Sequence, residues 1–156
     1  GGIDNALREY HREDLIGKSS EVVWTELLHE FTNYGASVED NMAADALSQA
    51  MENLEIEDIA DIGNVSVDIL LKEMLKEYIK ENFDFRYEEK ISKGKTPAQT
   101  SAILNDMHEY IENSIDGDLN LDNLKSVDFS NMGTSQIVED ALSDALSVFE
   151  KYYGED

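Results

Sequence analysis

Cysteine is absent from this 156-residue chain, which excludes disulfides, thiolate-bound zinc, iron–sulfur clusters and cysteine nucleophiles. Long apolar runs are absent as well. No stretch approaches the roughly 18–20 residues that cross a membrane, and the first residues lack the pattern of a signal peptide. We therefore expect a cytoplasmic protein with no membrane partner.

Basic residues are scarce in the composition. The chain has 12 Lys and Arg residues against 35 Asp and Glu residues, a formal net charge of −23. Such a charge repels phosphates, so we expect no direct binding of nucleic acid. Leu, Ile, Val and Phe still make up about a quarter of the chain, above the roughly one fifth below which disorder is expected. The composition therefore predicts a folded, acidic domain.

Proline occurs once, at a position that favours a helix. The sequence Thr96-Pro97-Ala98-Gln99 combines an N-cap threonine, a proline at the first helical position and the glutamine of a capping box. Apolar residues then recur at three- and four-residue spacing. This pattern predicts a helix over about residues 97–115, ended by Asp116-Gly117.

Four other segments show the same apolar spacing after a Ser or Thr that can cap a helix. They are residues 19–34, 37–54, 66–79 and 134–154, with a shorter helical piece over residues 6–14. In the last of them the apolar face is expected to run as far as Tyr152. No convincing strand pattern is found. We predict an all-α, single-domain bundle of about five principal helices.

Two long irregular connections are expected between these helices, residues 55–65 and 117–133. Each is expected to pack its apolar side chains onto the bundle, namely Ile56, Ile59 and Ile62 in the first and Val127, Phe129 and Met132 in the second. We expect residues 1–18 to form an N-terminal segment and residues 19–154 to form the bundle domain.

Basic residues gather in one part of the chain. Seven of the twelve lie within residues 72–95, where six acidic residues leave a net charge of +1. One interpretation is a solvated helix face, on which the lysines pair with Glu73, Glu77 and Glu81. The other is a contact patch for an acidic partner or a nucleotide. The residues of such a patch would be Lys72, Lys76, Lys80, Arg86 and Lys90.

Two spacings are typical of metal sites, but each is incomplete. Residues 116–122 resemble the opening of an EF-hand loop, yet Leu121 replaces the required glycine and Val127 replaces the closing glutamate. An ordinary loop rich in Asp and Asn explains the same residues. Glu26 and His29 have the Glu-x-x-His spacing of carboxylate-bridged sites, but no second such pair exists. We expect no metal and no cofactor.

Histidine is the residue most often used for acid–base catalysis near neutral pH. The three histidines are His11, His29 and His108, and none lies in a recognisable catalytic motif. His108, which has Glu109 and Glu112 nearby, is the best candidate for such a role. We expect a protein that is not an enzyme.

The chain begins Gly1-Gly2. We favour a remnant of tag removal over a native end. As a native end, Gly1 would present an unhindered amine with a pKa of about 7.7–8.0, which could accept a conjugated group.

Three stretches resemble the C-terminal helical region of the B component (QatB-like) of bacterial Qat anti-phage systems. They read SVEDNMAADALSQAMENL (residues 37–54), ILLKEMLKEYIKENFDFRYEEKI (69–91) and MHEYIENSI (107–115). The resemblance lies in the order and spacing of helices. It implies a non-enzymatic component that works with an ATPase, a QueC-like enzyme of the 7-deazaguanine type and a TatD-like nuclease. It also implies that the QueC-like enzyme joins a deazaguanine group to an N-terminal glycine, and Gly1-Gly2 fits that role.

We therefore predict an acidic helical interaction protein of an anti-phage defence system, itself a candidate substrate for N-terminal modification. Two alternatives stay open. One is an acidic mimic of nucleic acid that inhibits a DNA-binding protein. The other is a small enzyme, for which a pocket that gathers His108 with Glu112 or another perturbed carboxylate would be the sign.

Overall fold

The computed structural model describes four long helices and two short 3-10 turns. The described residues are 7–8, 12–19, 22–23, 25–27, 29, 38–57, 61, 67–120, 123–124, 126–129 and 131–154. In chain order the elements are η1 (Glu13–Leu15), α3 (Val38–Asn53), α4 (Val67–Ser92), α5 (Pro97–Asp118), η4 (Met132–Thr134) and α7 (Gln136–Tyr153). No strand occurs among these residues, and the predicted all-α fold is confirmed.

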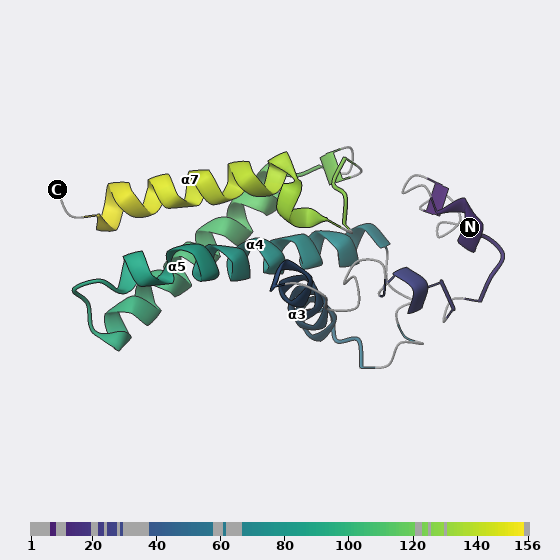
Figure 1. Cartoon of the computed structure of the whole chain (residues 1–156), viewed down its shortest axis with the longest axis horizontal. Helices are drawn as coiled ribbons and strands as arrows, with labels where there is room; N and C mark the ends of the chain where they lie inside the picture. The colour runs from purple at the N-terminus through teal and green to yellow at the C-terminus, as the bar shows by residue number, and fades with distance from the viewer. Residues whose placement is uncertain are drawn as a thin grey trace.

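The longest helix, α4, lies at the centre of the bundle (Figure 1). It contacts α3, α5 and α7, and α5 also contacts α7. Figure 1 shows α7 along α4, and α3 crossing α4 at a steep angle. Residues 12–19 lie at the opposite end of the molecule from the end of α7. No helix in the described part of the chain is long and apolar enough to span a membrane.

The predicted capping box begins α5 as expected. The Thr96 hydroxyl accepts a hydrogen bond from the Gln99 amide, and the Gln99 side chain accepts one from the Thr96 amide. The predicted stop at Asp116-Gly117 is wrong, because α5 continues to Asp118. Gly117 does not adopt the left-handed conformation of a glycine cap. Leu119 ends the helix instead in an extended conformation, with its amide bonded to the Ile115 carbonyl.

The turn between α4 and α5 depends on Gly94. Gly94 has φ +75°, a conformation that glycine adopts without the steric cost of a side chain. The amide of Lys95 then donates to the carbonyl of Ser92. This turn reverses the chain, so that α5 packs back along α4.

The apolar stripe predicted for α4 is buried and is longer than expected. Every residue of the predicted stripe whose side chain is described is buried: Leu70, Leu71, Met74, Leu75, Tyr78 and Ile79. The helix was expected over residues 66–79, but it runs to Ser92, because Phe83 and Ile91 continue the stripe and are fully buried. A helix with so much buried surface on one side can contact three neighbours.

In α7 the predicted apolar face is correct except at its end. Val138, Leu142 and Phe149 are buried, but Tyr152 is 69% exposed. Tyr153 packs against the core instead, with its ring stacked on that of Phe149 at 6.1 Å between centroids. The two tyrosines are consecutive, and consecutive residues of an α-helix point about 100° apart around its axis. Tyr152 therefore points away from the bundle when Tyr153 faces it.

The two connections pack onto the core where they are described. Ile56, Val127, Phe129 and Met132 are buried, as predicted, whereas Ile59 and Ile62 lie outside the described residues. Near the N-terminus, Leu7, Leu15, Val23 and Leu27 belong to the same core cluster as the long helices. Of the helix predicted over residues 19–34, residues 22–23, 25–27 and 29 are helical, whereas Trp24 and Phe31 lie outside the described residues.

Candidate functional site

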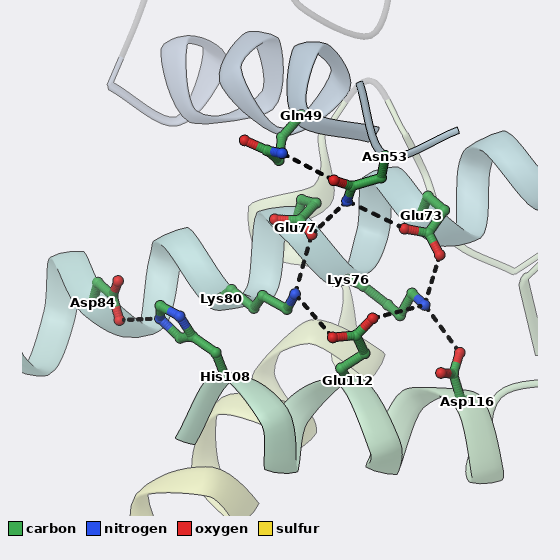
Figure 2. A network of polar contacts seen from close by, with 10 residues as sticks. All are labelled: Gln49, Asn53, Glu73, Lys76, Glu77, Lys80, Asp84, His108, Glu112 and Asp116. Atoms are coloured by element: carbon green, nitrogen blue, oxygen red, sulfur yellow. Dashed lines mark hydrogen bonds and ion pairs between the residues drawn. The ribbon is translucent and has the colours of Figure 1, made fainter. Parts of the chain in front are cut away.

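Three lysines spaced four residues apart on α4, Lys72, Lys76 and Lys80, pair with acidic side chains of α5. Figure 2 shows Lys76 and Lys80 with these partners. The central one, Lys76, is only 4% exposed. Its Nζ lies 2.7 Å from Oε1 of Glu73 on the same helix. Across the interface, Nζ lies 3.1 Å from Oδ1 of Asp116 and 3.6 Å from Oε1 of Glu112. Lys76 is therefore the centre of an ion-pair network that joins α4 to α5.

The protonation of Lys76 follows from these contacts. Burial disfavours the charged ammonium group, but hydrogen bonds to Glu73 and Asp116 outweigh the burial and raise the pKa of Lys76 above its ordinary value. The lysine is therefore a cation at every physiological pH. It neutralises carboxylates that would otherwise repel one another across the α4–α5 interface.

The network continues along α4 through Lys80 and reaches α3. Nζ of Lys80 lies 3.1 Å from Glu77 and 3.3 Å from the second carboxylate oxygen of Glu112. Asn53 of α3 donates to Glu77 at 3.0 Å, and Gln49 donates to Asn53 at 2.9 Å. Figure 2 shows this chain of contacts across the three helices.

Several of these side chains, though not Lys76 or Asp116, line an open pocket of about 540 Å³ between α3, α4 and α5. Its lining residues are Gln49, Asn53, Leu54, Glu73, Glu77, Lys80, His108 and Glu112. At one end, Nε2 of His108 lies 2.7 Å from Oδ1 of Asp84, a contact that orients the imidazole ring (Figure 2). No side chain in this described lining carries a hydroxyl or a thiol. The pocket thus offers a histidine and carboxylates but no hydroxyl or thiol nucleophile.

Two of the remaining basic residues of the predicted patch, Arg86 and Lys90, pair with α7. Arg86 contacts Glu139 through two bonds of 2.8 and 3.2 Å, and this pairing lowers the pKa of Glu139. Lys90 lies 3.0 Å from Glu150, and Lys72 at the other end of the row lies 3.8 Å from Asp116 of α5. All five predicted patch residues thus have acidic partners within the chain.

This pairing differs from the pairing expected within one helix. Glu73 and Glu77 do pair with lysines of α4, but most acidic partners come from α5 and α7. Helical spacing identified which lysines share a face, and spacing alone carries no information on which distant acids lie opposite. Contact of these five residues with an acidic partner or a nucleotide stays a prediction.

Glu81 has an acidic neighbour instead of a basic one. Its carboxyl group is hydrogen-bonded to Asp45 of α3, and burial together with this contact raises the pKa of Glu81 to about 7. The charges of Asp84 and Glu77 act in the same direction. A hydrogen bond between two carboxyl groups requires a proton, and Glu81 holds this proton at the α3–α4 interface below about pH 7. The sequence carried no signal for this contact, because the two residues are brought together only by packing.

The other candidate sites lie partly outside the description. Gly1, Gly2 and His11 are outside the described residues, as are Leu121 and Asp122 of the EF-hand-like segment. Asp116 itself belongs to α5 and pairs with lysines. Within the described residues, no group of three or more His, Asp or Glu side chains could hold a metal ion. Glu26 and His29 therefore belong to no such group there.

Comparison with known proteins adds the family. Residues 1–149 match the family model QatB, described as Qat anti-phage system associated protein QatB. No curated protein and no solved structure was matched. The family match covers nearly the whole chain, including all of α3, α4 and α5. The chain therefore belongs to the QatB family of proteins associated with Qat anti-phage systems.

Proposed function

We propose that this protein is a non-enzymatic interaction component of a Qat anti-phage system, and that it acts in the cytoplasm. Family membership supports the role in defence. The ion-pair network between α4 and α5 supports a structural role for the polar side chains. There Glu112 binds two lysines, and Asp84 holds His108. The histidine and carboxylate side chains that could serve in catalysis instead form contacts between α4 and α5.

The proposed partners are a QueC-like enzyme and an ATPase of the same system, as the family resemblance implies. We further propose that the QueC-like enzyme attaches a deazaguanine group to an N-terminal glycine of the chain, for which Gly1 is the candidate, with Gly2 beside it. In such a conjugation the neutral amine attacks an activated acyl carbon of the deazaguanine compound; an amide bond forms, the bond to the activating group breaks, and the amine loses a proton. An α-amino group with a pKa near 8 supplies the neutral form at neutral pH.

Co-expression tests this proposal. The full chain, tagged at its C-terminus, is produced with the QueC-like enzyme and the ATPase encoded by the same system, and the complex is isolated. We expect both partners to co-elute and the intact mass of the chain to rise by that of a deazaguanine group. An inactivated QueC-like enzyme serves as the control for the mass shift. A chain that elutes alone and unmodified would contradict the proposal.

A second candidate function, a small enzyme, is favoured by one observation. The pocket between α3, α4 and α5 gathers His108 with Glu112, and Asp84 orients the histidine. Replacing His108 with Gln keeps a hydrogen-bonding side chain but removes the imidazole ring. If the protein is an enzyme, His108→Gln abolishes protection against phage while the chain stays folded. Under the non-enzymatic proposal, protection is retained.

A further inference from the structure

A groove of about 360 Å³ lies along the seam between the end of α5 and the start of α7. Ile115 and Leu119 come from the α5 side and are buried. Ile137 and Ala141 of α7 are half-buried and pack against the core. The groove thus has an apolar floor that is supported from below by the bundle.

Two exposed carboxylates of α7 stand on the rim of this groove, and both accept hydrogen bonds from neutral donors. Asp140 accepts from the Gln136 amide at 2.8 Å. Asp144 accepts from the Tyr110 hydroxyl at 2.6 Å. Neither has an ion pair with a lysine or arginine of the described chain. Their two negative charges are therefore uncompensated there.

The distribution of positive charge explains this difference. α5 contains no lysine or arginine, and α7 contains only Lys151, whose Nζ lies 5.5 Å from the Tyr152 ring at the far end of the helix. The basic residues of α4 pair with acids that face α4: Glu112 and Asp116 on α5, and Glu139 and Glu150 on α7. The groove acids receive none of this charge.

We propose that the α5–α7 groove binds a basic amphipathic segment of a partner protein. An apolar side chain of that segment would cover Ile137 and Ala141, and flanking Lys or Arg side chains would pair with Asp140 and Asp144. A net charge of −23 attracts a cationic segment at long range, and the apolar floor then selects segments that also bury hydrophobic surface. This inference rests on the proposed function as an interaction protein and assigns the surface that it uses.

A designed peptide provides the probe. It is a helix of Leu and Lys at amphipathic spacing, titrated into the full chain labelled at its Ile, Leu and Ala methyl groups. We expect shifts at Ile115, Leu119, Ile137 and Ala141. A peptide with Ser in place of Leu, and one with Glu in place of Lys, serve as controls and should each bind at least about tenfold more weakly. Equal binding of the Ser peptide would overturn the proposal, because attraction would then be purely electrostatic.

Matched variants separate the groove from the overall charge. D140N/D144N removes two negative charges at the rim, whereas E88Q/E89Q removes two exposed charges from α4. We expect the first variant to weaken peptide binding about tenfold and the second by less than about twofold. Equal effects of the two variants would overturn the proposal, and circular dichroism verifies that both stay folded.

Co-elution with the natural partners distinguishes this inference from the proposed function. If neither the QueC-like enzyme nor the ATPase co-elutes with the unmodified sequence, the proposed interactions fail, whatever the peptide titration shows. If they co-elute equally well with the unmodified sequence and with D140N/D144N, the groove is not their docking site and the inference is overturned, while the proposed function stands. Loss of a partner with D140N/D144N but not with E88Q/E89Q supports both.

Discussion

At the scale of single residues, Lys76 shows how one buried cation organises an acidic interface. It is almost inaccessible and contacts three carboxylates. Two of these, Glu112 and Asp116, are nearly half exposed, so water partly screens their repulsion. Removal of this cation leaves Glu112 with Lys80 and Asp116 with the long contact to Lys72, but Glu73 loses its ion pair, and breaking a buried ion pair in this way is costly.

We predict that Lys76→Met lowers the free energy of unfolding by about 2 kcal/mol, below the full cost of breaking a buried pair because of that screening. Urea unfolding followed by circular dichroism measures the change. Lys72→Met is the matched control: its single contact is long, at 3.8 Å, and its side chain is 30% exposed. It should cost less than about 0.5 kcal/mol. Equal losses for the two variants would show that Lys76 has no special role.

Glu81 makes stability depend on pH near neutrality. Its folded-state pKa of about 7 lies above the ordinary value of 4.5, so the folded chain binds a proton that the unfolded chain releases. The stabilisation is therefore fully present below about pH 4.5 and is lost as pH rises through about 7. Above that range, Glu81 and Asp45 are both charged and repel each other.

We predict that Glu81→Gln, which keeps a donor to Asp45 without a titrating proton, flattens the decline in stability between pH 5 and 8. At pH 8 the variant should be more stable by roughly 1 kcal/mol, a value reduced for solvent screening of this partly exposed group. Urea midpoints across the pH series measure the effect. Glu88→Gln, at an exposed position of the same helix, should leave the profile unchanged, and an equally flattened profile in that variant would refute the assignment.

At the scale of elements, the helices begin in two different ways. α5 has a complete capping box at Thr96, whereas Ser135 at the start of α7 makes no side-chain capping bond. Helix N-termini expose amide groups that need acceptors, and a capping side chain supplies one. The two helix starts therefore form an internal comparison.

We predict that Thr96→Ala destabilises the protein by about 1 kcal/mol, because one capping bond of α5 is lost. Ser135→Ala should change stability by less than about 0.5 kcal/mol, since its hydroxyl makes no such bond. Thermal unfolding of the two variants beside the unmodified chain provides the measurement. A larger loss at Ser135 than at Thr96 would contradict the capping geometry.

At the scale of the whole molecule, basic residues are concentrated on the central helix and acids surround them. Ion pairs between α4 and its neighbours α5 and α7 compensate part of the acidic charge along these helix contacts. The many acids that remain give the chain its net charge of −23, and their mutual repulsion opposes the compact state.

We predict that raising KCl from about 0.02 to 0.5 M stabilises the protein, because salt screens this repulsion over distances longer than about 4 Å. The exposed ion pairs weaken at the same time, but each contributes little. Urea midpoints across the salt series test the sign. The E88Q/E89Q variant, with two fewer charges, should show a smaller rise, and a fall in stability with salt would show that the ion pairs dominate.

The sequence by itself determined the class of fold and most helix positions. Capping residues and apolar spacing act over a few residues, and so α5 could be placed from Thr96 and α7 from Ser135 and Gly154. Local patterns predicted ends that are too early for two helices: α5 continues to Asp118 and α4 continues to Ser92. Packing against neighbouring helices decides how far a helix continues.

The tertiary structure alone decided the partners of charged residues. The sequence placed Lys72, Lys76 and Lys80 on one face, but only the packing of α5 against α4 brought Glu112 and Asp116 opposite them. Likewise, the contact of Asp45 with Glu81 joins residues 36 positions apart. Electrostatic interactions depend on distance in space, and a sequence records only separation along the chain.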